Sequence, residues 1–190
     1  MKRIALLLAL ILAAPAAAQA QAVTAPAGSD PAAATNAFYA VYGPQVGKGG
    51  GIPDTAARLR YAAVLSPRLN KQLSDAAAAQ ARLTAKVKNA VPPMLEGDIF
   101  SSLFEGATGW KVGTCQSDGN TARCPVTLTH VSPAIAGRPP VKPAHWTDTV
   151  LLTNGPGGWK VDDVIYDAGF AFGNTGRLSA MLRMVIAATP

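Results

Sequence analysis

The chain contains few cysteines, few histidines, few charges and few aromatic side chains. Of its 190 residues, 2 are cysteine, 2 are histidine, 15% are charged and 6% are aromatic. Two cysteines exclude a cysteine-rich scaffold and a zinc-ribbon array, and two histidines without a carboxylate cluster make a poor metal site. Hydrophobic residues still make up 49% of the chain, which excludes a wholly disordered protein despite 15 prolines. We expect one folded domain that needs no metal or cofactor.

The longest apolar run lies at the N-terminus. Two basic residues precede the apolar residues 4–14, which are too few to span a bilayer comfortably. The Ala-Gln-Ala sequence at 18–20 has the small residues that signal peptidase requires. We expect residues 1–20 to be a cleaved signal peptide and residues 21–29 to be a flexible leader. An uncleaved membrane anchor is the alternative, which the short apolar run disfavours.

The rest of the chain lacks a lipid-attachment cysteine, a second membrane-spanning run and a dense basic stripe. Cleavage removes two of the 17 basic residues and none of the 11 acidic ones, so 15 minus 11 leaves a net charge of +4. This excess is spread along the chain, and nucleic acid is therefore not an expected partner. We predict a periplasmic protein without a lipid anchor, whose partner is a small ligand or another envelope protein. No sequence feature indicates the oligomeric state.

Capping residues and apolar spacing predict three helices at the start of the domain, which we place at residues 30–190. Asp30 and Ser66 each precede a proline, and Asp54 precedes a further apolar stretch, as at helix N-termini. The first helix, which should end at Gly43, has an aromatic inner face. The third is long and amphipathic, with a spacing more typical of packing on a sheet than of a coiled coil.

From residue 108 the apolar period changes to two, which is typical of strands. Glycine-rich turns near 119–120 and 154–158 indicate two hairpins. A short helix is expected at 177–187. Helices followed by an antiparallel sheet predict the α+β class. The expected strands are 108–115, 121–130, 146–153 and 159–166.

Two loops contain residue types that often occur in functional sites. Four glycines between 47 and 51 make a flexible loop, but it lacks the Gly-Lys-Ser/Thr ending of a phosphate-binding loop. The segment 95–106 contains Glu96, Asp98 and Glu105, whose spacing could resemble a hydrolase pair. Nothing fixes their separation in space, so we expect this segment to be a loop that caps the sheet.

Cys115 and Cys124 bracket the first hairpin. If residues 119–120 form a two-residue turn, the two cysteines face each other and an oxidising compartment lets them bond. This register sends the apolar residues of the two strands to opposite faces unless a bulge near Gly113 corrects it. The alternative is a shifted register with two free thiols. A Cys-X-X-Cys motif is absent, so the predicted disulfide is structural.

The second hairpin places two aspartates on its tryptophan-bearing face. Trp146 and Asp148 share one face of their strand, and Trp159 and Asp163 share one face of the next. If Leu152 lies opposite Trp159, then Asp148 lies opposite Asp163. Two carboxylates that close repel each other unless a cation lies between them.

Three arrangements of this acidic pair are open. It could lie in a ligand cavity with an acid/base carboxylate. It could instead be neutralised by Arg60 or Arg58 in a structural salt bridge, or be exposed at a sheet edge. The sequence contains no complete catalytic constellation, so no catalytic residue is assigned. Our candidate pocket comprises Arg60, as the cation, with Tyr61, Trp146, Asp148, Trp159 and Asp163.

Several segments form a pattern when taken together. They are RLRYAAVLSPRL (58–69), LEGDIFSSLFEGATGWKVG (95–113), ARCPVTLTH (122–130), WTDTVLL (146–152), GWKVDDVIY (158–166) and GRLSAMLR (176–183). This pattern resembles a family of bacterial envelope proteins classed as a domain of unknown function, which is similar to the nuclear-transport-factor-2-like superfamily. The resemblance implies a cone-shaped fold in which N-terminal helices pack in a curved antiparallel sheet of about four strands. It implies no catalytic residues.

We therefore expect an exported, non-catalytic binding or envelope-accessory protein. The first alternative is a small-molecule enzyme of the cone fold, of the isomerase or dehydratase kind, with an inward aspartate as base. The second is a protein–protein adaptor that uses the sheet face. A deep apolar pocket around an unpaired carboxylate would favour the enzyme, and a large exposed apolar patch would favour the adaptor.

Overall fold

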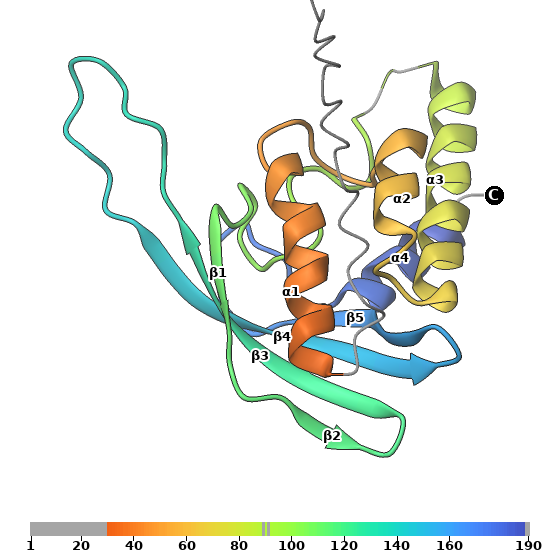
Figure 1. Cartoon of the computed structure of the whole chain (residues 1–190). Helices are drawn as coiled ribbons and strands as arrows, with labels where there is room; N and C mark the ends of the chain where they lie inside the picture. Colours follow the sequence, from red (N-terminus) through yellow and green to blue (C-terminus); the bar gives the residue numbers. More distant parts are fainter. Residues whose placement is uncertain (1–29, 89, 91, 189–190) are drawn as a thin grey trace, which may run out of the picture.

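A computed structural model of the chain describes residues 30–88, 90 and 92–188 (Figure 1). The predicted signal peptide, residues 1–20, and leader, residues 21–29, lie outside the described residues. Within the described part, no helix is both long enough and apolar enough to cross a bilayer.

The order of the elements confirms the predicted α+β class. Within the described residues, three α-helices and one 3-10 helix come first, an antiparallel sheet follows, and a further α-helix comes last (Figure 1). The elements are α1 (Pro31–Tyr42), η1 (Gly43–Gln45), α2 (Thr55–Tyr61), α3 (Pro67–Val87), β1 (Gly109–Val112), β2 (Gln116–Asp118), β3 (Thr121–His130), β4 (Ala144–Gly155), β5 (Gly158–Tyr166), β6 (Gly176–Arg177) and α4 (Leu178–Ala187).

The first three α-helices begin at the predicted caps. The side chains of Asp30, Asp54 and Ser66 each accept a hydrogen bond from a first-turn backbone N–H, at 2.9, 2.7 and 3.0 Å. Each bond satisfies a donor that has no partner within its helix. Pro31 and Pro67 occupy the first helical position, where a missing N–H costs nothing.

The sheet has six strands, so the expectation of about four was wrong. Its order is β1-β3-β4-β5-β6, and β2 pairs with β3 on the same edge as β1. The strand expected at 108–115 ends early, and the chain resumes pairing as β2. The two-residue strand β6 is too short to give a periodic signal in the sequence.

The interruption between β1 and β2 is the predicted bulge. Val112 pairs with Val126, and pairing resumes where Gln116 faces Arg123, so β3 has one residue fewer in this interval. A single extra residue reverses the alternation of faces. It therefore lets the apolar side chains before Gly113 and the cysteine after it use the same face of the sheet.

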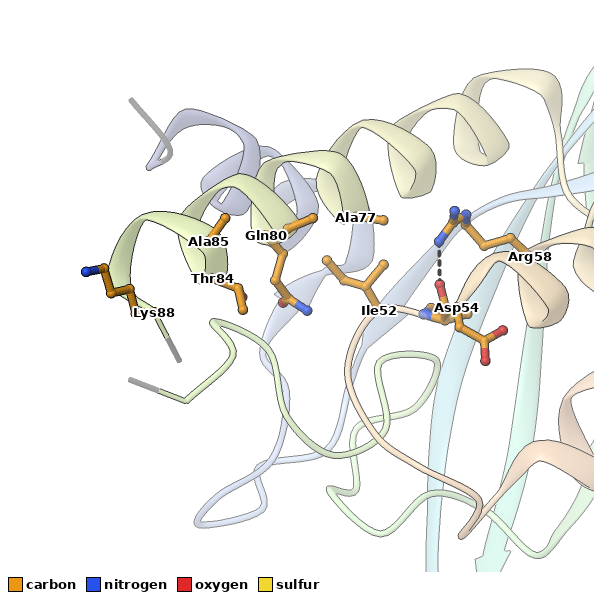
Figure 2. A pocket seen from close by; sticks show the side chains of 10 residues that line it. Ile52, Asp54, Arg58, Ala77, Gln80, Thr84, Ala85 and Lys88 are labelled. Carbon is orange, nitrogen blue, oxygen red and sulfur yellow. Dashed lines mark hydrogen bonds between the residues drawn. The ribbon is translucent and has the colours of Figure 1, made fainter. Parts of the chain in front are cut away.

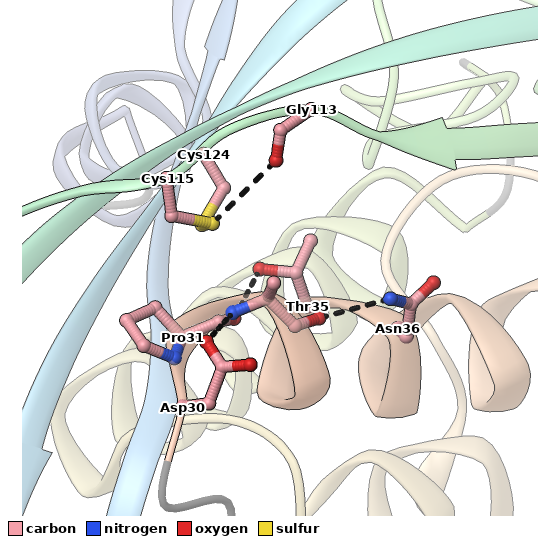
Figure 3. Close-up of a disulfide and its surroundings, with 8 residues drawn as sticks. Asp30, Pro31, Thr35, Asn36, Gly113, Cys115 and Cys124 are labelled. Atoms are coloured by element: carbon pink, nitrogen blue, oxygen red, sulfur yellow. Dashed lines mark hydrogen bonds between the residues drawn. A yellow bond between two sulfur atoms is a disulfide. The ribbon is translucent and has the colours of Figure 1, made fainter.

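Cys115 and Cys124 form the predicted disulfide, with their sulfur atoms at bonding distance. Cys124 is fully buried. The bond lies beside the first turns of α1 (Figure 3). It ties the outer strand β2 to the body of the sheet, which is a structural role.

We expect reduction of this disulfide to lower the free energy of unfolding by about 2–3 kcal/mol, since the unfolded chain loses a constraint that closes a loop of about ten residues. Urea unfolding with and without dithiothreitol measures the difference. The double variant Cys115→Ala/Cys124→Ala is the control and should be insensitive to reductant. Equal stability of the oxidised and reduced wild-type protein would contradict the expectation.

An aromatic cluster fills the space between α1 and the rest of the core. Phe38 lies 5.5 Å from Phe100 and 6.0 Å from Tyr61 between ring centroids, and Tyr61 lies 4.9 Å from Phe100. Tyr39 and Tyr42 complete it, and all five side chains are at most 3% exposed. This is the predicted aromatic inner face of the first helix. The hydrophobic area that it buries is a main source of the stability of the domain.

Helix α3 packs chiefly against α4, with further contacts to α2 and β5, rather than mainly on the sheet. Its first turn is held at the sheet edge, where Ser66 N donates to Val161 O at 2.8 Å. Arg68 forms an ion pair with Asp162 at 2.8 Å. The hydrogen bond to Asp162 raises the pKa of Arg68, so the guanidinium stays charged.

Candidate functional site

The two tryptophans of the second hairpin face the interior, as predicted. Trp146 is 7% exposed and Trp159 is 8% exposed. The aspartates on the same strands are also buried, since Asp148 is 0% and Asp163 is 4% exposed. The hypothesis that a sheet edge exposes both acids was therefore wrong.

The predicted register of this hairpin was also wrong. Trp159 pairs with Asn154 rather than with Leu152, because the turn is tighter than expected and closes between Gly155 and Gly158. A bulge then adds one residue to β5, so Asp163 pairs with Leu151. Asp148 and Asp163 are consequently not cross-strand neighbours.

Hydrogen bonds, rather than an arginine, satisfy the carboxyl group of Asp148. Its carboxylate accepts from Ser102 N at 2.7 Å, Trp146 Nε1 at 3.0 Å and Asp167 N at 3.1 Å. The Ser102 hydroxyl donates a further hydrogen bond to it. Four donors can satisfy a buried carboxylate without an ion pair. This network fastens the loop after Phe100 to strand β4.

Asp163 caps helix α4 from outside the helix. It accepts from Ser179 N at 2.9 Å, from Ser179 Oγ at 2.6 Å and from Val164 N at 3.0 Å. The residue at the N-cap position, Arg177, makes no side-chain cap hydrogen bond. An acid at a helix N-terminus satisfies free N–H groups and interacts favourably with the helix dipole.

Arg60 is not the cation of this acidic pair, and neither is Arg58. Arg60 lies on the surface and donates to Gln45 Oε1 at 2.9 Å. Arg58 donates to Pro53 O at 2.7 Å and to Thr55 Oγ1 at 3.1 Å. The salt-bridge hypothesis was therefore wrong, because both guanidinium groups have other partners on the side of α2.

Of the six candidate pocket residues, Arg60 and Tyr61 line a surface pocket of about 320 Å³. The glycine-rich loop forms one wall of this pocket, and residues 97–100 form another. Trp146, Asp148, Trp159 and Asp163 lie elsewhere, in the core, so a ligand could reach them only by displacing packed side chains. Their contact with a ligand stays a prediction.

Close packing of two loops explains the glycines of this wall. Gly51 N donates to Gly97 O at 2.5 Å. A Cβ atom on Gly50 would come within 2.5 Å of Gly97 N, so a larger residue there would force the loops apart. Gly51 also has a φ of 75°, which L side chains rarely adopt. The glycine-rich loop therefore packs closely against residue 97 and forms a defined wall of the pocket.

Asp98 lines the same pocket. The sequence predicted it in a loop that caps the sheet and did not place it among the candidate pocket residues. Burial raises its pKa to about 7, although hydrogen bonds from Phe100 N, Tyr42 and Ser101 lower it in part. The residue as a whole is partly exposed. Its carboxyl group nevertheless lies among protein donors, since Phe100 N donates to Asp98 Oδ1 at 2.8 Å and Tyr42 and Ser101 also hydrogen-bond to it. Near neutral pH this group is therefore partly protonated.

The chemistry of this pocket suits a small ligand with one anionic group. Tyr61 and Phe100 provide a buried aromatic floor, at 2% and 3% exposure. Lys48 and Arg60 contribute cations from exposed positions. Burial raises the pKa of Tyr61, so its hydroxyl stays protonated. An apolar body could rest on the rings while its charge meets the cations.

A second hollow, of about 550 Å³, shares residues 52–54 with the first pocket (Figure 2). Small residues of α3 form one side of it, and Arg58 reaches it from α2. Gln80 Oε1 is buried there without a hydrogen-bond partner. Its lining contains no aromatic side chain.

The two histidines do not meet acidic or cysteine side chains. His130 Nδ1 lies 2.7 Å from Gly106 O, and His145 Nδ1 lies 3.0 Å from Thr129 Oγ1. In the part of the chain that the structure describes, no group of three or more His, Cys, Asp or Glu residues is placed to hold a metal ion.

Comparisons of this chain with known protein families, with curated proteins and with solved structures found no match. The functional argument therefore depends on the geometry of the chain itself.

Proposed function

We propose that this protein is an exported, non-catalytic binding protein of the bacterial envelope. Its ligand is a small molecule with an apolar or aromatic body and one anionic group. The signal-peptide pattern supports export to the periplasm. The cone-shaped arrangement of the nuclear-transport-factor-2-like superfamily is part of this proposal, and the placement of helices before an antiparallel sheet is compatible with it.

The observation that carries the proposal is the 320 Å³ pocket with an aromatic floor and two cations. Its size falls within the range of small-molecule sites. The charged residues of the lining are Lys48, Arg60, Asp54 and Asp98. Because the pKa of Asp98 is about 7, this acid loses its charge below neutral pH, and the balance then favours an anion.

The two aspartates considered as a general base for the enzyme alternative, Asp148 and Asp163, are both buried and hydrogen-bonded. Asp148 is fully buried and accepts four hydrogen bonds, and Asp163 is engaged with the start of α4. A general base must reach the proton that it removes. Neither aspartate has an open approach, so the binding function is the better supported of the two.

Benzoate, with an aromatic ring and one carboxylate, is a suitable first probe for this pocket. We expect Arg60→Gln to weaken benzoate binding at least about tenfold, as for loss of a charge-assisted hydrogen bond. Isothermal titration calorimetry at pH 6 measures the affinity. Arg82→Gln, a matched change at an exposed site on α3, should leave it unchanged. Absence of binding by wild type, or equal losses in both variants, would refute the proposal.

A further inference from the structure

A long arm between β3 and β4 projects from the body of the molecule. It comprises residues 131–143 and forms the extended loop whose tip lies farthest from the helices in Figure 1. Its apolar side chains are exposed, with Val131 at 53%, Ile135 at 57% and Val141 at 66%. Exposed apolar residues gathered on one projecting segment indicate a contact surface.

The arm is stiff for a segment outside regular structure. Four prolines fix its φ angles and remove N–H groups, which prevents the arm from extending the sheet. A turn at Gly137, where Arg138 N donates to Ile135 O at 3.1 Å, reverses the chain. Proline-rich segments lose little conformational entropy when they bind, and they commonly dock in grooves lined by aromatic rings. The four prolines are Pro133, Pro139, Pro140 and Pro143.

A groove lined by aromatic rings lies at the same end of the molecule. We call it the aromatic groove; it has a volume of about 470 Å³. Phe172 is 90% exposed and Phe104 is 43% exposed, which is unusual for phenylalanine. The groove is lined by Leu103, Phe104, Glu105, Phe170, Ala171, Phe172 and Gly173.

Hydrogen bonds and ring contacts hold the aromatic groove in shape. Asn174 Nδ2 donates to Asp98 O at 2.6 Å and to Ser101 O at 2.7 Å, which joins the two loops that form the groove. The Phe170 ring packs edge-on against Trp146, with centroids 5.5 Å apart. A groove that is already formed avoids the cost of ordering its loops on binding.

The base of the arm adjoins the aromatic groove. His130 Nδ1, at the end of β3, lies 2.7 Å from Gly106 O, next to Glu105. Trp146, near the start of β4, contacts Phe170 of the groove. The tip of the arm points away from the body, so a second molecule related by a two-fold axis can accept the arm while offering its own.

The charges of the two surfaces are opposite. The arm carries Arg138 and Lys142 and contains no acid, whereas the aromatic groove carries Glu105 and no base. Complementary charge steers association and fixes the orientation of the partners. The arm of a second copy therefore matches the groove in its apolar residues and its charge.

We propose that two copies of this chain form a symmetric dimer by exchanging arms, each arm docking in the aromatic groove of the other copy. Val141 and the neighbouring prolines lie against Phe104 and Phe172, and a basic residue of the arm pairs with Glu105. No lining residue is shared between the aromatic groove and the ligand pocket beside Arg60, and the experiments on the two sites change different residues, so either proposal can fail without the other.

The test measures the association state of the full mature chain by light scattering after size exclusion, over a wide range of protein concentration. Wild type should form a dimer. Phe172→Ser and a chain whose residues 132–142 are replaced by Asn-Gly should each dissociate at concentrations at least about tenfold higher. Leu59→Ser, at another exposed apolar side chain (72% exposed) outside both surfaces, should behave as wild type. Circular dichroism confirms that each variant is folded.

Mixing the two defective variants gives the decisive readout. The intact arm of the Phe172→Ser chain can dock in the intact groove of the shortened chain, so the mixture should form a heterodimer at concentrations where neither variant associates alone. A monomeric wild type, a dimer unaffected by both changes, or a mixture without heterodimers would overturn the proposal. Wild-type monomers that bind a proline-rich peptide of other sequence, or fatty-acid vesicles, would assign the groove to another partner and overturn it too.

Discussion

Replacing Asp148 by alanine is expected to lower the free energy of unfolding by at least about 3 kcal/mol. The change removes both carboxylate oxygens and leaves three buried donors without a partner, namely two from Ser102 and the Trp146 indole N–H, and it also removes the acceptor of the part-buried Asp167 N. Each buried donor that loses its partner costs about 1–3 kcal/mol. Single substitutions rarely exceed this total, so the effect should stand out in urea denaturation.

Asp75→Ala provides the matched control for this experiment. Asp75 pairs with Lys71 one helical turn away at 2.6 Å, and both side chains are largely exposed. Exposed pairs of this kind contribute about 0.5 kcal/mol or less. If Asp148→Ala lowers the free energy of unfolding no more than Asp75→Ala does, the donors around Asp148 must hydrogen-bond to water in the variant. That result would contradict the burial of this site.

Asp98 should make the protein less stable as the pH rises from about 4 to about 7. Its pKa is about 7 in the folded protein and about 4 in an unfolded chain. Between these values the folded state binds a proton that the unfolded state does not. The stabilisation is thus fully present below about pH 4 and is lost as the pH rises through about 7. The three-unit difference corresponds to about 4 kcal/mol.

The variant Asp98→Asn isolates this contribution. Asparagine keeps an acceptor for Phe100 N, which donates to Asp98 Oδ1 at 2.8 Å, but it does not titrate. Urea denaturation between pH 4 and pH 8 gives the free energy of unfolding of both proteins as a function of pH. The difference between the two pH dependences is the contribution of Asp98. The wild type should lose more stability than the variant over this interval. Parallel curves would show that the carboxyl group is hydrated in the folded protein.

Local chemistry in the sequence predicted the helices well. The caps at Asp30, Asp54 and Ser66 depend on a side chain and the next few backbone amides, so their information lies within one turn. The disulfide and the bulge near Gly113 could also be predicted from residues that are close in the sequence. A two-residue turn fixed the pairing of the cysteines, and the apolar alternation required one extra residue.

The register of the second hairpin could not be predicted in this way. Its turn segment, 154–158, contains five candidate residues, and each choice of turn shifts every pair in the hairpin. The partners of Asp148 and Asp163 come from Ser102 and Ser179, which lie 46 and 16 residues away in the chain. Hydrogen bonds of this range leave no periodic signal. The sequence therefore suggested arginines as the partners of the two aspartates, whereas the structure shows backbone amides and hydroxyl groups that donate hydrogen bonds to them.

The bulge in β5 has a consequence for the relation between α3 and α4. Consecutive side chains usually leave a strand on opposite faces, yet here Asp162 engages Ser66 and Arg68 at the start of α3 while Asp163 engages Ser179 at the start of α4. One inserted residue thus sets the alignment of two helix starts at once. Deleting it would disturb the anchors of both helices together.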